Sequence, residues 1–206
     1  MAASGGKLLL ATHNEHKRRE FERLLASDAG GRWQVQTLPD TVRLPPEDGE
    51  TFAENALGKA RAAAASTGRL SIADDSGIAA AALGGAPGVR SARYAGERAS
   101  DEENLQKLLR EVPVGGELEY VCAIAYVDPV AGVEQIFEGR CGGRLSERPR
   151  GERGFGYDPA FLPDDGPPNL TMAELTDAQK DEISHRGRAA RALLQWLDGS
   201  SGASAG

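Results

Sequence analysis

Two adjacent carboxylates, Asp74 and Asp75, follow a short apolar run and are themselves followed by Ser76 and a glycine. A carboxylate beside an apolar strand is unfavourable unless water, a cation or a hydrogen-bond donor compensates it. The pair is therefore either an acidic turn between two strands, which Asp-Ser-Gly favours, or a site that binds a metal ion and activates water. The remaining motifs of the chain bear on this choice.

A second acidic turn contains Glu47 and Asp48, with Glu50 close by. Proteins usually hold Mg²⁺ with one or two carboxylates, together with waters and substrate phosphates. Such a metal stabilises the charge that develops in phosphoryl displacement, and a neighbouring carboxylate can deprotonate the attacking water. Acidic turns are common, so this spacing alone is only a weak indication of a magnesium site.

A cationic strand-to-helix turn, Thr-His-Asn-Glu-His-Lys, occupies residues 12–17. Helix N-termini present free backbone N–H groups and therefore bind phosphates. Lys17, Arg18 and Arg19 fall in the first turns of this helix, where cations are electrostatically disfavoured. The three charges indicate either a bound anion or a solvated basic helix face. The P-loop pattern Gly-x-x-x-x-Gly-Lys is absent from the sequence, so the turn is not a P-loop.

Two later motifs have the residue types that bind a planar ring. In Gly-Phe-Gly-Tyr-Asp-Pro, two glycines flank Phe155 and allow a ligand to approach it. A base stacked on such a ring contributes about 1–3 kcal/mol. Further along, Ser-His-Arg-Gly follows Lys180, and Gly187 indicates a helix break that aims the His-Arg pair. The alternatives are a phenylalanine that fills the core and an ordinary helix surface.

Composition limits the classes of function. The formal net charge of −7 argues against broad binding to nucleic acid. No apolar run approaches the roughly 20 residues that span a membrane, and the N-terminus shows no signal peptide. Cys122 and Cys141 form neither a disulfide framework nor a metal-binding spacing. We expect a cytoplasmic protein with free thiols and with neither nucleic acid nor a membrane as partner.

Hydrophobic patterns predict a mixed-sheet α/β fold that positions these motifs. Strands are expected at residues 7–12, 33–38 and 70–73, and residues 118–127 and 133–145 read as a long hairpin. Helices are expected after Asn14 and over residues 51–67, 101–110 and 176–197, and the first of these carries Phe21, Leu24 and Leu25 on its inward face. Capping boxes mark helix starts at Thr51 and Thr171.

The domain organisation predicted from these patterns is simple. Residues 7–198 form a single catalytic domain of two lobes, because no linker is long enough to separate two domains. Residues 1–6 are expected to be a flexible N-terminus. The low-complexity residues 199–206 are expected to be a disordered tail.

The motifs in their order along the chain resemble the non-canonical purine nucleoside triphosphate pyrophosphatases, the family of inosine/xanthosine triphosphatases and dITP/XTP pyrophosphatases. The matching stretches are ATHNEHK from Ala11, TFAENA from Thr51 with Lys59, IADDSG from Ile72, GGAPG from Gly84, SARYAG from Ser91, GFGYDP from Gly154, EL from Glu174 and ISHRG from Ile183. They run from about residue 7 to residue 197. Each stretch alone is a weak signal, but the ordered set is specific.

The resemblance implies an elongated, two-lobed α/β fold around a long mixed β-sheet with flanking helices, assembled as a homodimer. It also implies Mg²⁺-dependent hydrolysis of XTP, ITP and dITP to the nucleoside monophosphate and pyrophosphate. Asp75 would be the catalytic base and a metal ligand. Glu47 would be the second metal ligand, with Asp48 or Glu50 as alternatives because this turn varies in the family.

The resemblance also implies which residues bind the nucleotide. The expected contacts are Thr12, His13, Asn14, Glu15, His16 and Lys17 at the triphosphate, Ser76 beside it, and Phe155, Gly156, Tyr157, Asp158, Lys180, His185 and Arg186 around the nucleoside. His13 departs from the family pattern, which more often has a small residue or asparagine. The side-chain role at that position is therefore open.

Base selectivity suggests roles for two residues. Hypoxanthine and xanthine present an O6 acceptor and an N1–H donor, and adenine inverts both. If Asp158 faces N1–H, and Arg186 or a backbone N–H faces O6, adenine is left unpaired at two points, which can discriminate by about 10⁴ or more. Two other functions stay open: a Maf-like pyrophosphatase acting on pyrimidine or modified nucleotides, and a non-hydrolysing nucleotide-binding module. The aromatic loop argues against the first and the intact acidic pair against the second.

Overall fold

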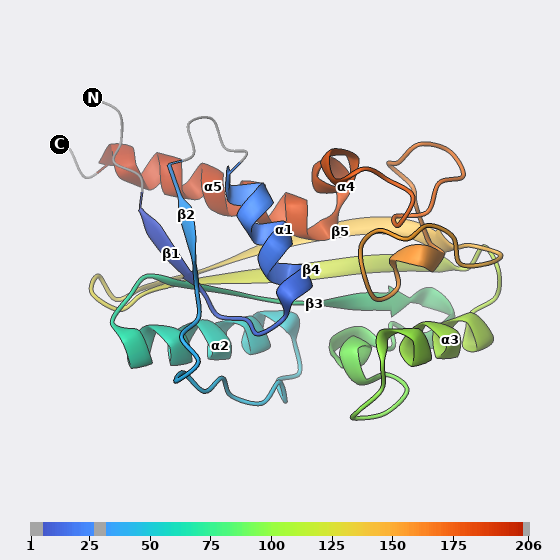
Figure 1. The fold of residues 1–206 in the computed structure, drawn as a ribbon, viewed down its shortest axis with the longest axis horizontal. Helices are drawn as coiled ribbons and strands as arrows, with labels where there is room; N and C mark the ends of the chain where they lie inside the picture. Colours follow the sequence, from blue (N-terminus) through green and yellow to red (C-terminus); the bar gives the residue numbers. More distant parts are fainter. Residues whose placement is uncertain (1–5, 27–31, 204–206) are drawn as a thin grey trace. The chain divides into compact units, whose positions relative to one another are not determined.

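The computed structural model describes residues 6–26 and 32–203, with side chains through residue 199 (Figure 1). The chain forms two compact units. Unit 1 consists of Met1–Asp75, Ala123–Glu138 and Ala189–Gly206, and unit 2 consists of Ser76–Cys122 and Gly139–Arg188. The chain first passes from unit 1 to unit 2 between Asp75 and Ser76, which are neighbours in one strand.

Within the described residues, one mixed sheet has the strand order β2-β1-β3-β4-β5-β6. The strands are β1 (Lys7–Leu10), β2 (Gln34–Thr37), β3 (Ser71–Ala80), β4 (Glu117–Asp128), β5 (Val133–Leu145) and β6 (Phe161–Pro163). β1 pairs in parallel with β2 and β3, whereas β5 and β6 are antiparallel. The predicted mixed α/β class is therefore confirmed.

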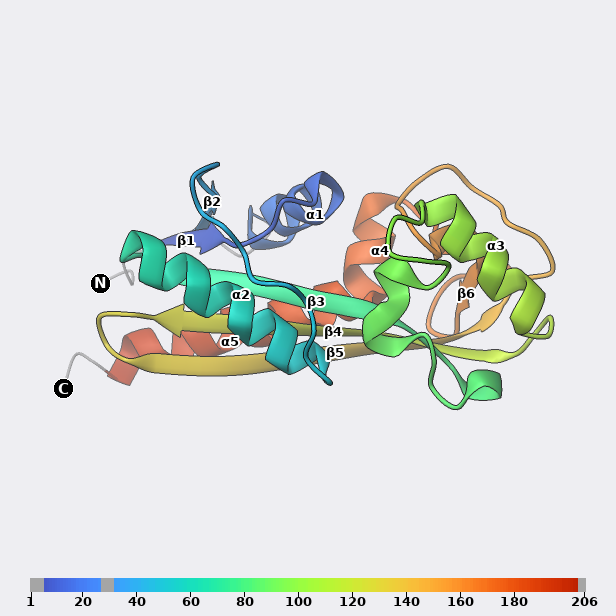
Figure 2. The same ribbon diagram turned by 90° about the horizontal axis from the view of Figure 1, so that it is seen from below.

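The helices are α1 (Glu15–Ala26), α2 (Phe52–Thr67), α3 (Asp101–Glu111), α4 (Asp177–Ile183) and α5 (His185–Ala203). In unit 1, α2 lies on one face of the strands and α1 and α5 lie on the other (Figure 1). The view from below places α2 in front of β3 (Figure 2). None of the helices within 6–26 and 32–203 is long and apolar enough to cross a membrane.

Alanine spacing explains how α2 packs so closely on the sheet. Ala56, Ala60 and Ala63 are fully buried on one side of the helix, and they pack with residues of β1 and β3 in the core of unit 1. Alanine is also the best helix former. The predicted capping box is confirmed, because Thr51 and Glu54 cap each other's backbone N–H groups. The inward face of α2 is therefore held at a fixed distance from β3.

The capping box predicted at Thr171 is wrong as a helix start. The Glu174 carboxylate accepts from the Thr171 backbone N–H at 2.8 Å, but the Thr171 hydroxyl donates to the Arg150 carbonyl at 2.8 Å. The hydroxyl therefore anchors a neighbouring loop, and residues 171–176 form a turn. The helix begins later, where Thr176 and Gln179 make a capping box for α4.

The last helical segment is interrupted where the sequence has Ser-His-Arg-Gly. Ser184 adopts an extended conformation that ends α4, and its hydroxyl accepts from the Gly187 N–H at 3.1 Å. A Cβ at Gly187 would lie 1.9 Å from the Asp181 carbonyl oxygen, so glycine permits this close approach. The predicted break is therefore confirmed. Helix α5 includes residues 199–203 of the predicted disordered tail, and residues 1–5 and 204–206 lie outside the described residues.

Replacing Gly77 with alanine is expected to lower the free energy of unfolding by about 1–3 kcal/mol, the usual range for overpacking a buried site. A Cβ at Gly77 would lie 2.4 Å from the Ser91 hydroxyl oxygen and 2.5 Å from the Gly88 carbonyl oxygen. Gly58→Ala is the control, because its Cβ would meet only Pro45 Cγ at 3.8 Å. That change in the body of α2 should raise stability by about 0.5–1 kcal/mol. Urea denaturation measures both, and equal effects would contradict the close contact at Gly77.

Candidate active site

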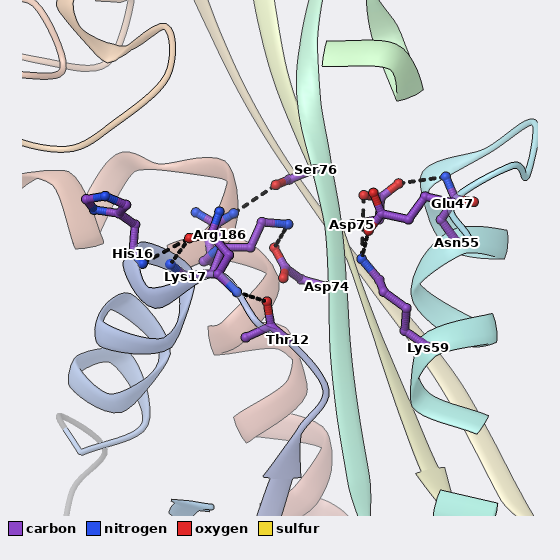
Figure 3. Close-up of polar contacts among 11 residues, drawn as sticks. Thr12, His16, Lys17, Glu47, Asn55, Lys59, Asp74, Asp75, Ser76 and Arg186 are labelled. Carbon is purple, nitrogen blue, oxygen red and sulfur yellow. Dashed lines mark hydrogen bonds and ion pairs between the residues drawn. The ribbon is translucent and has the colours of Figure 1, made fainter. Parts of the chain in front are cut away.

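Asp74 and Asp75 lie inside β3, and the alternative of an acidic turn between two strands is wrong. The strand continues through Gly77 because Ser91 supports it from outside, accepting at 2.8 Å from the N–H of Ile78. Successive side chains of a strand point to opposite faces. Asp74 therefore points toward α1 and Asp75 toward α2 (Figure 3). Both are buried, with exposed fractions of 1% and 5%.

Asp75 belongs to a polar cluster that α2 completes. We call Glu47, Asn55, Lys59 and Asp75 the Asp75 cluster. The Lys59 ammonium pairs with Glu47 and lies 3.8 Å from Asp75 Oδ1. The Asn55 amide donates to Asp75 Oδ2 at 2.9 Å and accepts from the Gly49 N–H at 2.8 Å. Because Asn55 and Lys59 are four residues apart, they share one face of the helix and address the same carboxylate.

The surroundings of Asp75 increase the affinity of its carboxylate for a proton. Burial raises the pKa of Asp75 above its ordinary value, although Lys59 and Lys17 oppose the shift. Burial also disfavours the charged form of Glu47, but the charge and hydrogen bond of Lys59 outweigh it and lower the pKa of Glu47. The pKa of Lys59 is raised, because the nearby carboxylates outweigh its burial. A carboxylate with a raised pKa is suited to accept a proton from water.

The Asp75 cluster fits a magnesium ion that shares its coordination with a substrate. The described part of the chain contains no group of three or more His, Cys, Asp or Glu side chains that could hold a metal. The carboxylates of Glu47 and Asp75 nevertheless both lie next to the same positive charge, the ammonium of Lys59. Two carboxylates suffice when water and phosphate oxygens supply the remaining ligands. Asp48 and Glu50, the alternative ligands, are exposed.

On the opposite face of β3, Lys17 forms an ion pair with Asp74. Its ammonium lies 3.1 Å from Asp74 Oδ2, and its side chain is 13% exposed. Contact of Arg18 or Arg19 with a bound anion stays a prediction. Both guanidinium groups pair with Glu15, one turn back on the same helix, and such pairs compensate helical charges locally. Of the three cations, Lys17 is the one directed at β3.

Side chains at the start of α1 accept hydrogen bonds from some of the backbone N–H groups of its first turn. The Asn14 side chain accepts from the backbone N–H groups of His16 and Lys17, at 2.9 and 3.1 Å. Thr12 accepts in turn from the Asn14 N–H at 3.1 Å. These contacts shape the predicted phosphate turn, but they occupy N–H groups expected to face an anion. His13 is exposed, and phosphate binding by the turn stays a prediction.

In unit 2, Asp158 is buried and receives three hydrogen bonds. Lys180 donates to Oδ2 at 2.6 Å and the Phe155 N–H donates to the same oxygen at 3.0 Å. The Tyr120 hydroxyl donates to Oδ1 at 3.1 Å. Gly154 is required here, because a Cβ would lie 2.0 Å from Asp158 Oδ2. A carboxylate has about four acceptor positions, so about one is left for a ligand.

Phe155 lies among the cations of the predicted nucleoside pocket. The Lys180 ammonium is 5.3 Å and the Arg186 guanidinium carbon 5.7 Å from the ring centroid. Arg186 is 1% exposed and donates to the Ser76 hydroxyl at 2.8 Å. The ring itself is half-buried. The structure therefore brings together five of the predicted substrate-binding residues within unit 2, namely Ser76, Phe155, Asp158, Lys180 and Arg186.

Tyr157 and Gly156 direct their polar groups into the protein. The Tyr157 ring packs in the core of unit 2 and its hydroxyl donates to the Ser91 carbonyl at 2.7 Å. The Gly156 N–H donates to Asp101 at 3.0 Å. Both residues therefore support the loop that carries Phe155 and Asp158. Contact of Tyr157 or Gly156 with a nucleotide stays a prediction.

Three residues at these sites had no predicted role, namely Asn55, Lys59 and Tyr120. Asn55 and Lys59 were detectable, since they are polar positions on the buried face of an alanine-rich helix. Tyr120 was not detectable, because it lies in an apolar strand where a tyrosine reads as core. His185 stacks on its ring with centroids 4.5 Å apart.

The fold and the site together define an α/β protein whose third strand buries paired carboxylates next to lysines. The chain belongs to the Ham1 family, whose model matches residues 8–196.

Known proteins agree with this membership over most of the chain. The dITP/XTP pyrophosphatase of Shouchella clausii is 45% identical over 201 residues, covering 94% of this chain and 97% of that protein. The dITP/XTP pyrophosphatase of Frankia alni is 48% identical over 200 residues, covering 93% and 96%. A HAM1 protein from Coxiella burnetii is similar in structure, with a TM-score of 0.80, 38% identity and coverage of 93% and 98%.

Proposed function

We propose that this chain hydrolyses deaminated purine nucleoside triphosphates, namely XTP, ITP and dITP, to the monophosphate and pyrophosphate. The observation that carries the proposal is the Asp75 cluster, which provides a buried carboxylate of raised pKa oriented by Asn55. The relatives named dITP/XTP pyrophosphatase support the choice of substrate. Removal of such nucleotides would cleanse the cellular nucleotide pool.

The residues of unit 1 have distinct roles in this reaction. Asp75 accepts the proton of the water that attacks the α-phosphorus in line with the departing pyrophosphate. Lys17 binds the triphosphate and compensates its charge. Glu47 and Asp75 would hold Mg²⁺, which neutralises phosphate oxygens when it is bound. The fit of these two carboxylates to one cationic position supports this assignment.

The residues of unit 2 would recognise the base. Phe155 would stack on the purine, and Lys180 and Arg186 supply donors for O6. Adenine presents a donor at that position, so neither cation can donate a hydrogen bond to it, and a hydrogen bond lost between a ligand and a buried site is strongly disfavoured. The one remaining acceptor position of Asp158 restricts how it can face N1–H. We further propose a cytoplasmic homodimer, in keeping with the family resemblance.

A panel of nucleotides tests the proposal. Pyrophosphate release is measured separately with XTP, ITP, dITP, GTP, ATP and dTTP in the presence of Mg²⁺. We expect the three deaminated purines to be hydrolysed at least about 10²-fold more efficiently than ATP, since lost pairing with buried polar groups can discriminate by 10⁴ or more. Guanine shares O6 and N1–H with hypoxanthine, so rejection of GTP requires that no acceptor faces its 2-amino group. A preference for dTTP would favour a Maf-like enzyme. Binding without pyrophosphate release would favour a non-hydrolysing module.

A further inference from the structure

Tyr120 of β4 connects two residues of the predicted nucleoside pocket. Its hydroxyl donates to Asp158 Oδ1 at 3.1 Å. Its ring is stacked on the His185 ring, with centroids 4.5 Å apart and an angle of 7° between the planes. The ring of Phe161 also packs against it, with centroids 4.6 Å apart. One side chain therefore touches both the carboxylate and the imidazole, which come from different segments of unit 2.

The hydroxyl of Tyr120 adds little to packing. The side chain is 6% exposed and lies in the core of unit 2, where phenylalanine would fill nearly the same volume. A buried hydroxyl is unfavourable unless it finds a hydrogen-bond partner. Here the partner is the carboxylate that also receives Lys180 and the Phe155 N–H. The Tyr120 hydroxyl therefore hydrogen-bonds to the Asp158 carboxylate, and that carboxylate in turn orients the ammonium of Lys180 and the loop of Phe155.

We infer that Tyr120 is a positioning residue for base recognition, an inference that rests on the proposed function. Donors on both oxygens of Asp158 fix the rotation of its carboxylate. That rotation fixes the direction of Lys180 and of the remaining acceptor position. The stacked ring holds the plane of His185. Deaminated purines depend on these groups through O6 and N1–H, whereas adenine pairs poorly with them in any orientation.

Tyr120→Phe tests the hydroxyl alone, because it keeps the ring. A hydrogen bond to a charged group is stronger than one between neutral groups, and its loss corresponds to roughly a 10-fold change in affinity. We therefore expect KM for ITP to rise about 10-fold while kcat changes less than about 2-fold, and the ITP/ATP ratio of kcat/KM to fall about 10-fold. Tyr126→Phe is the matched control, because Tyr126 lies on the same strand, is also 6% exposed and packs against Trp196. It should change none of these values.

Tyr120→Leu tests the ring. The NMR signals of the His185 ring protons are shifted by the stacked aromatic ring, so they should move in Tyr120→Leu and stay in place in Tyr120→Phe. Affinity for inosine monophosphate, measured by calorimetry, should fall about 10-fold in Tyr120→Phe, as expected for one hydrogen bond to a charged group. Affinity for adenosine monophosphate should not change.

Three outcomes would overturn the positioning role. They are an unchanged affinity of Tyr120→Phe for inosine monophosphate, equal losses for inosine and adenosine nucleotides, and a change confined to thermal stability. The proposed function fails separately, if the wild-type protein releases no pyrophosphate from any nucleotide. Because monophosphate binding and the His185 signals require no turnover, they test Tyr120 in either case.

Discussion

Replacing Asp75 with asparagine is expected to lower the rate of pyrophosphate release from ITP by about 10³-fold, within the range attributed to general base catalysis. Asparagine is nearly isosteric but cannot accept the proton of the attacking water. The neighbouring cations, Lys17 and Lys59, remain to bind phosphate. Affinity for ITP should therefore change only a fewfold. Single-turnover kinetics and calorimetric titration measure the two quantities.

Stability measurements check that Asp75→Asn leaves the fold intact. The folded state raises the pKa of Asp75, so the folded protein holds its proton more tightly than the unfolded chain. The free energy of unfolding therefore falls as pH rises from the unfolded-state pKa of Asp75 to its folded-state pKa. The full loss of stability is present above the folded-state pKa. Without Mg²⁺ and nucleotide, Asp75→Asn should be at least as stable as the wild type at neutral pH. This advantage should disappear in acid.

Asp74→Asn is the matched variant for the assignment of the base. Asp74 points to the other face of β3 and pairs with Lys17, so its loss should affect mainly triphosphate binding. KM for ITP should rise more than kcat falls. If Asp74→Asn abolished turnover and Asp75→Asn retained it, the base would be Asp74.

Replacing Lys59 with methionine is expected to lower the free energy of unfolding by about 3–5 kcal/mol, because it leaves the buried carboxylate of Asp75 without its cation. Lys59 is buried and addresses Glu47 and Asp75 together. Arg61→Met is the matched control on the same helix, since Arg61 forms an exposed pair with Glu134. Exposed pairs contribute only about 0–1 kcal/mol. Urea denaturation without divalent cations measures both changes.

Magnesium should reverse part of the Lys59→Met defect. A divalent cation at Glu47 and Asp75 would replace the lost positive charge, so added Mg²⁺ should raise the unfolding midpoint more in Lys59→Met than in the wild type or in Arg61→Met. The same increase in all three proteins would argue against magnesium binding at the Asp75 cluster. If Lys59→Met and Arg61→Met lowered the free energy of unfolding equally, the buried ion pairs of Lys59 would contribute no more to stability than the exposed pair of Arg61.

Local patterns were enough to predict most of the scaffold. Three consecutive leucines predict the buried strand β1, and Leu8, Leu9 and Leu10 are at most 1% exposed. The capping box at Thr51 and the alanine stripe predict α2 to within a residue of its observed start. These signals are reliable because each depends on neighbours close in the sequence.

Contacts between distant segments account for what the sequence did not reveal. Asp-Ser-Gly reads locally as a turn, but Ser91 holds that segment extended and so places the two aspartates on opposite faces of β3. The hydroxyl of Thr171 caps no helix because it finds the Arg150 carbonyl instead. The role inferred for Tyr120 depends on its contacts with Asp158 and His185, which are far away in the sequence. None of these partners is visible from local composition.

One measurement tests the proposed reaction most directly. Equal amounts of ITP and ATP are incubated together with the protein and Mg²⁺ in ¹⁸O-labelled water, and the products are identified by mass spectrometry. Attack of water at the α-phosphorus predicts labelled inosine monophosphate, unlabelled pyrophosphate and intact ATP. Inosine diphosphate with labelled phosphate, or adenosine monophosphate formed at a comparable rate, would contradict the proposed function.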